Sequence, residues 1–89
     1  MKLRRGDLVV VDWLDAAAHA PGWEDAPENV AEKCHSVGIV TAVSASAITL
    51  AADYGPKKHR EHVNRAFTIP VGMVTRVRRV NLARCEVVK

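Results

Sequence analysis

The sequence predicts a single mostly-β domain, folded as a small five-stranded barrel. Its 89 residues provide for only one hydrophobic core, so residues 1–89 are expected to form one domain. Short runs of β-branched and apolar residues recur along the chain, and turn residues separate them. That number of short strands favours a barrel over a sandwich, which usually needs more strands.

The first strand is predicted over Leu8–Leu14, which is rich in β-branched and aromatic residues. Alternation along a strand places Val9, Val11 and Trp13 on one face and Asp12 on the other. The face with the valines and the tryptophan is the expected core side.

A long insert at residues 15–35 then interrupts the β pattern. Its second half has the features of a helix start, because Asp25 is a good N-cap and Pro27 fits the first turn. Val30 and Cys34 are four residues apart and would face inward from about two helical turns. The sequence therefore predicts a short helix in the insert between the first two strands.

Four further strands complete the predicted barrel. A glycine inside the first of them, Gly38, predicts a bend or bulge. Residues 71–74 are expected to form a turn, and the polar, basic segment at 55–65 is expected to be an exposed loop. The predicted strands lie at 36–43, 47–52, 65–71 and 75–80, with a short additional strand at 83–88.

The order of these features resembles a known group of proteins. The pattern V-x-V-x-W-x-D at residues 9–15 precedes Gly22-Trp23, Ser36-Val37-Gly38 and Ile69-Pro70, with spaced valines following. It is similar to small proteins of phages, prophages and other mobile elements that are expected to be SH3-like barrels. The resemblance implies an SH3-like barrel and a genomic context but no activity.

The charge of the chain is unevenly distributed. Residues 1–32 carry three basic and seven acidic side chains, whereas residues 33–89 carry ten basic and three acidic ones. Such a distribution favours an anionic partner or head-to-tail self-association. The longest apolar run is four residues, too short to span a bilayer, and no signal-peptide pattern follows the N-terminus. We therefore expect a cytoplasmic protein that does not enter membranes.

The first functional hypothesis is a protein-interaction or self-assembly module. Trp23 lies in the insert near Asp15, and a tryptophan there either packs the insert onto the barrel, the more common case, or anchors an interface. Tyr54 is the other aromatic residue expected at the surface. Open edges of a small barrel also permit strand-to-strand assembly, as in Sm-like rings, whose topology the sequence does not exclude.

The alternative hypothesis is nucleic-acid binding. It rests on basic side chains in the 57–65 loop and in the last barrel strand, where Arg76 and Arg78 project from one face. Aromatic residues make up only 4% of the chain, which disfavours base stacking. The candidate phosphate contacts are Lys57, Lys58, Arg60, Arg65, Arg76 and Arg78.

No catalytic or metal-binding motif stands out. Cys34 and Cys85 lack C-x-x-C spacing and are expected to be free thiols packed as small hydrophobes. His59-x-x-His62 lacks the second ligand pair typical of structural zinc sites, and the isolated glycines form no phosphate loop. We therefore expect no enzyme activity, cofactor, metal or small-molecule substrate.

Overall fold

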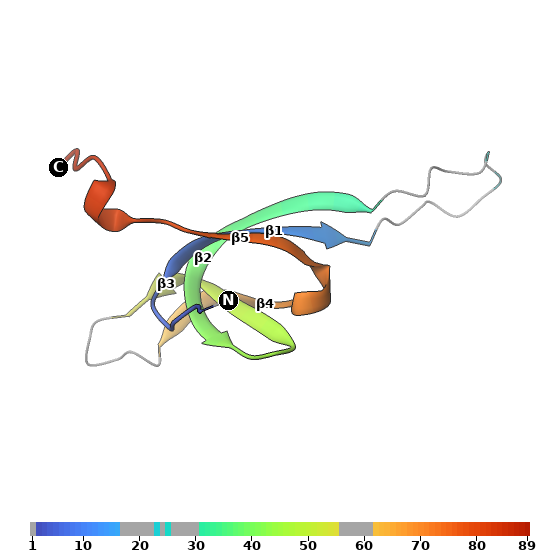
Figure 1. The fold of residues 1–89 in the computed structure, drawn as a ribbon, viewed down its shortest axis with the longest axis horizontal. Coiled ribbons are helices and arrows are strands. Elements are labelled where there is room, and N and C mark those ends of the chain that lie inside the picture. The colour runs from blue at the N-terminus through green and yellow to red at the C-terminus, as the bar shows by residue number, and fades with distance from the viewer. Residues whose placement is uncertain (1, 17–22, 24, 26–30, 56–61) are drawn as a thin grey trace.

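The computed structural model describes residues 2–16, 23, 25, 31–55 and 62–89 and confirms a mostly-β chain. Five antiparallel strands form one sheet in the order β4-β3-β2-β1-β5 (Figure 1). Two short 3-10 turns are the only helical elements in these residues. The elements are β1 (Leu8–Asp15), β2 (Glu32–Val43), β3 (Ala47–Tyr54), β4 (Val63–Pro70), η2 (Val71–Met73), β5 (Val74–Arg79) and η3 (Leu82–Arg84).

The sheet does not close into the expected barrel, because its two edge strands, β4 and β5, do not pair with each other. They are joined only by the predicted turn, which is the 3-10 turn η2. Pro70 ends β4, and η2 then redirects the chain toward β1 instead of back along β4. The five-stranded antiparallel sheet is therefore confirmed, whereas the closed barrel is wrong.

The core lies on the concave side of the curved sheet. Val9 and Val11 are fully buried there, as predicted, and Trp13 packs against them while remaining partly exposed. Phe67 is 44% exposed, and its ring centroid lies 6.2 Å from that of Trp13. It therefore lies at the margin, where β4 approaches β1 across the curve. The remaining core side chains are Val40, Ile48, Leu50 and Ile69.

Gly38 allows the sheet to curve sharply. The bulge predicted at this position lies instead between Val40 and Ala42 of β2, while Gly38 pairs with Val9 in regular register. A Cβ atom at Gly38 would lie 3.0 Å from the Cβ of Leu50, closer than nearly all Cβ contacts in proteins. The glycine is needed because β3 crosses close to β2 at this point.

Several predicted segments differ from the structure. Cys34, expected on a helix, lies in β2 opposite Trp13, because pairing with β1 continues to Glu32. The rest of the predicted helix, at residues 26–30, lies outside the described residues. The additional strand expected at 83–88 is absent, and the 3-10 turn η3 begins that segment. Both cysteines are free, but Cys85 is exposed and not packed.

The longest strand pair extends beyond the rest of the sheet. Figure 1 shows β1 and β2 continuing side by side past β5, while the C-terminal segment leads away from the sheet on the other side. Asp15 and Glu32 face each other at the end of this two-stranded arm. Among the described residues, none of the helical turns is long and apolar enough to cross a membrane.

Candidate functional site

The sheet concentrates charged side chains around Asp12, on the face opposite the core. Asp12 lies in the central strand β1, directly opposite His35 of β2 and Arg76 of β5. Arg76 Nε donates to Asp12 Oδ2 at 2.8 Å, Arg78 Nη2 donates to Oδ1 at 3.2 Å, and His35 Nδ1 lies 2.6 Å from Oδ1. We call these four residues the Asp12 cluster.

The cluster shields its carboxylate from water. Asp12 is only 7% exposed, although it lies on the outer side of the sheet. Hydrogen bonds from His35 and then from Arg76 lower its pKa from 3.8 to about 2, against the opposing effect of burial. Asp12 therefore carries its negative charge at any physiological pH and holds β5 and β2 to the central strand.

The cluster nevertheless leaves the outer face positive. Two guanidinium groups face one carboxylate, and Arg76 and Arg78 use only one N–H each, of the five available, to bind it. Both arginine side chains are at least half exposed. A shallow pocket lies beside the cluster, with Lys33 and Thr75 among its lining residues. This face can therefore attract an anionic group without losing its own internal ion pairs.

The other arginine predicted to contact nucleic acid lies elsewhere. Arg65 belongs to β4, at the opposite edge of the sheet from β5. Its guanidinium binds the carboxylate of Asp53 in β3, with Nη2 3.0 Å from Oδ2. Lys57, Lys58 and Arg60 lie outside the described residues. The structure thus brings Arg76 and Arg78 together, as their spacing predicted, but separates Arg65 from them.

The three residues predicted for a protein interface also have different environments. Trp23 has a relative exposure of 106%, so its side chain is fully exposed among the described residues. Asp15 accepts a hydrogen bond from the backbone N–H of Ala16 at the end of the β1–β2 arm. Tyr54 donates its hydroxyl hydrogen to the carbonyl of Val40 at 2.7 Å, which is a structural role. Only Trp23 therefore retains the properties of an interface anchor.

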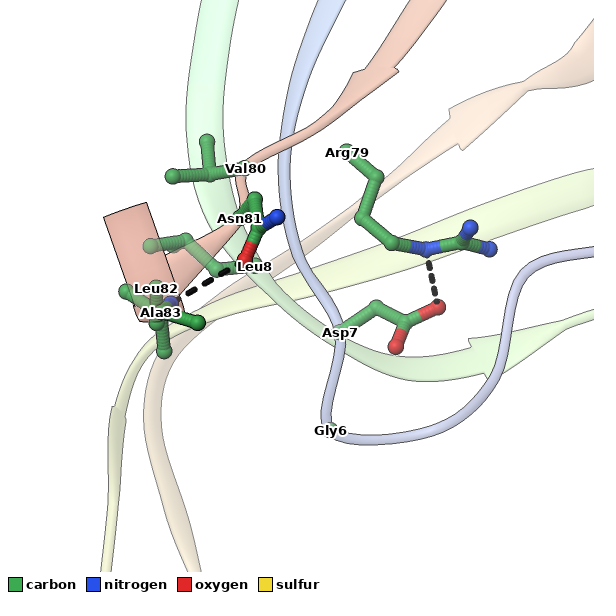
Figure 2. Close-up of a pocket in the computed structure, with 8 residues that line it drawn as sticks. All are labelled: Gly6, Asp7, Leu8, Arg79, Val80, Asn81, Leu82 and Ala83. Carbon is green, nitrogen blue, oxygen red and sulfur yellow. Dashed lines mark hydrogen bonds and ion pairs between the residues drawn. The ribbon is translucent and has the colours of Figure 1, made fainter. Parts of the chain in front are cut away.

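A second pocket lies where the N-terminal turn meets the end of β5 (Figure 2). On one side, Arg79 Nε donates to Asp7 Oδ2 at 3.1 Å, and on the other, Asn81 accepts from the backbone N–H of Ala83. The Asp7 carboxylate also accepts from the backbone N–H of Arg4, which is the main reason that the pKa of Asp7 is lowered. These contacts close the turn and give the pocket a structural role.

Asp12 was not predicted as a site residue, although the sequence contains a signal for it. Aspartate is disfavoured within strands, and a charged residue in a central strand requires partners. Among the strands that the structure describes, β5 alone has two arginines spaced two residues apart, and it offers such partners at Arg76 and Arg78. The topology of the sheet places β5 beside β1. The local pattern of residues does not show which strand will be the neighbour of β1.

Comparisons with protein-family models, with curated proteins and with solved structures give no match. The geometry of the described residues therefore carries the functional argument alone.

Proposed function

We propose that this chain is a non-enzymatic interaction module, which binds another protein or a further copy of itself through an SH3-like sheet that remains open. The order of the strands, with one 3-10 turn between β4 and β5, supports the SH3-like description. The charged clusters of the described residues form internal ion pairs.

One observation carries this proposal: in the part of the chain that the structure describes, the outer edges of β4 and β5 are unpaired, and the side chain of Trp23 is fully exposed. Unpaired strand edges are templates for pairing with another chain. Tryptophan is also among the residues that contribute most to protein interfaces when an interface buries it. A small sheet with both features is better suited to association with another protein chain than to binding a small molecule.

Light scattering coupled to gel filtration tests the proposal over a series of protein concentrations. We expect a mass above that of the monomer, or a defined complex with a protein partner, and a loss of either in Trp23→Ala. The matched control is Val88→Ala, which shortens another exposed apolar side chain, on the C-terminal segment. A strict monomer that forms no complex with any protein would overturn the proposal.

Nucleic-acid binding is a second candidate, supported by the positive outer face around the Asp12 cluster. Phosphate contacts there would make the affinity fall steeply with salt. Fluorescence polarisation with labelled oligonucleotides at low and moderate salt measures this directly. Arg76→Gln/Arg78→Gln should weaken binding if β5 contacts phosphates, and Lys57→Glu/Arg60→Glu tests the loop in the same way. Unchanged affinity in both variants would exclude these residues.

The resemblance to proteins of mobile elements leads to a related proposal about origin. We infer that the gene belongs to a phage, a prophage or another mobile element and that its product acts in the cytoplasm. The neighbouring genes test this inference, because genes of mobile elements travel in groups. A neighbourhood of ordinary chromosomal genes in every genome that carries the chain would contradict it.

A further inference from the structure

The backbone of β5 presents hydrogen-bonding groups at its free edge. The N–H of Val80 donates to the carbonyl of Leu8, and the register places these two residues opposite each other. In an antiparallel pair, hydrogen-bonded positions alternate with positions whose N–H and C=O point away from the partner strand. Arg78 therefore directs its backbone groups toward β1, whereas Val77 and Arg79 direct theirs toward the free edge.

The side chains of β5 specify what kind of strand can pair there. In an antiparallel addition, Val77 would occupy a hydrogen-bonded position, and Arg76 and Arg78 would occupy the closely spaced positions beside it. Cα atoms at such positions lie about 4.5 Å apart, so opposing side chains touch. The added residues facing the two arginines would lie on the outer face, and the one facing Val77 on the core side, where Val77 is partly buried.

The other edge of the sheet is a poor template. The N–H of Val71 donates to the carbonyl of Ser46, so the backbone of Pro70, one residue earlier, faces away from β3. Proline has no N–H to offer at that position. Arg65, within the same strand, has a positive φ of 54°, and its position is missing from the β3–β4 register. Strand addition is therefore favoured at β5.

We propose that the free edge of β5 binds an extended segment of a partner protein in which acidic and apolar residues alternate. The acidic side chains would face Arg76 and Arg78, and the apolar residue between them would lie beside Val77. This inference rests on the proposed function as an interaction module and adds the edge, the orientation and the chemistry of the partner.

Charge complementarity identifies this occupant. The arginines of β5 repel other basic edges, which protects the sheet from aggregation, but they attract an acidic strand. Asp12 already shows the geometry on the β1 side, where a carboxylate lies opposite Arg76 and is bound by both arginines. A sugar–phosphate chain can meet the same guanidinium groups, yet its phosphates provide no N–H for the outward carbonyl of Val77.

Synthetic peptides test the proposal on the unmodified protein. The probe is a fluorescent peptide of about seven residues in which glutamate and valine alternate, matched in length to a typical strand. The control has the same composition with its glutamates adjacent to one another. We expect fluorescence polarisation to show that the alternating peptide binds about tenfold more tightly than the control, a difference that affinity measurements resolve readily.

Methylated peptides separate strand pairing from simple charge attraction. N-methylation of the valine amides removes donors that face Val77 and Arg79, so binding should be lost. N-methylation of the glutamate amides removes groups that point away from β5, so binding should persist. Equal effects of the two modifications would overturn the proposal, as would equal binding of the adjacent-glutamate control.

Protein variants test whether the peptide binds at β5. Arg76→Gln/Arg78→Gln should weaken binding about tenfold or more, whereas Arg84→Gln/Lys89→Gln, which removes the same charge from exposed residues of the C-terminal segment, should not. Circular dichroism checks that each variant is folded, and Arg76→Lys/Arg78→Lys replaces the glutamine pair if it is not. Its point charges keep the attraction but lose the planar fork, so an intermediate affinity is expected.

The outcomes distinguish this inference from the proposed function. Absence of peptide binding, together with an association that depends on Trp23, would overturn the β5 inference and leave the interaction module intact. Absence of both would overturn both. Displacement of the peptide by an oligonucleotide at equal charge concentration, with no difference between the methylated peptides, would assign the β5 face to nucleic acid instead.

Discussion

Two acid–arginine contacts in this sheet look alike in sequence but differ in their surroundings. Asp12 and Asp53 each bind an arginine of a neighbouring antiparallel strand. The side chain of Asp12 is 11% exposed and lies in the central strand, with partners from both sides. The side chain of Asp53 is 47% exposed and contacts the edge strand β4.

The difference shows that burial determines how much an ion pair contributes to the stability of the fold. A shielded carboxylate requires partners, because a carboxylate removed from water and left without them is strongly destabilising. An exposed pair competes with water and with the entropy of two mobile side chains, so its contribution is small. The ion pairs of Asp12 therefore stabilise the pairing of three strands, whereas the ion pair of Asp53 contributes little to the stability of the edge strand β4.

The largest expected effect is that of Asp12→Ala. The substitution removes the shared acceptor and leaves Arg76 and Arg78 near each other without a carboxylate between them. We expect the midpoint of thermal unfolding to fall by about 10 °C, as is typical when one member of a shielded ionic group is removed from a small domain. Differential scanning calorimetry measures it, and an unchanged midpoint would refute the importance of the cluster.

Acid should reproduce part of this loss in the unmodified protein. The pKa of Asp12 is about 2 in the folded state, against an ordinary value of 3.8. The folded state therefore binds the proton less readily, and the stability due to this carboxylate is complete above pH 3.8 and is lost as the pH falls through about 2. Urea unfolding at decreasing pH should show a steeper decline than in Asp12→Asn, in which only other carboxylates, including Asp7, titrate.

Gly38→Ala tests the close contact between β2 and β3 at the point where the sheet curves. The new Cβ would lie 3.0 Å from that of Leu50 and 3.1 Å from the carbonyl oxygen of Ala51. We expect a loss of about 2 kcal/mol in the free energy of unfolding, the usual cost of overpacking. Gly72→Ala is the matched control, since a Cβ there meets no atom within 4 Å. Equal stability of both variants would show that β2 and β3 can separate freely.

The smallest effect is expected for Asp53→Ala. It removes an exposed ion pair with Arg65 and an exposed hydrogen bond from Asn64. The free energy of unfolding should change by no more than about 1 kcal/mol, the upper end of the range measured for exposed pairs. Chemical denaturation of Asp12→Ala and Asp53→Ala side by side compares the two sites directly. A larger effect at Asp53 would reverse the comparison.

The sequence predicted the strands well because their signals are local. Alternation identified the buried face of β1, and the turn at Val71 lies where expected. Signals that depend on a neighbouring strand were misinterpreted. Cys34 fitted a helical spacing, but pairing with Trp13 extends β2 through it. Phe67 has the hydrophobicity of a core residue, yet it lies on an edge strand that the sheet does not cover.

The candidate site was predicted in part. The spacing of Arg76 and Arg78 correctly placed both on one face of β5. Their shared acceptor could not be identified, because Asp12 lies more than sixty residues away in the chain and only the strand order brings it between them. For Trp23 the sequence left two roles open, packing of the insert or anchoring of an interface, and the structure shows an exposed side chain.

The irregular edge at β4 has a consequence for the size of any assembly. A sheet with two receptive edges can add copies without limit, and such growth produces fibres. Here Pro70 and the left-handed Arg65 make one edge unreceptive, so a segment that pairs with β5 has no equivalent site at which the next one can continue. Strand addition to this protein would then stop after one step and give a complex of fixed stoichiometry.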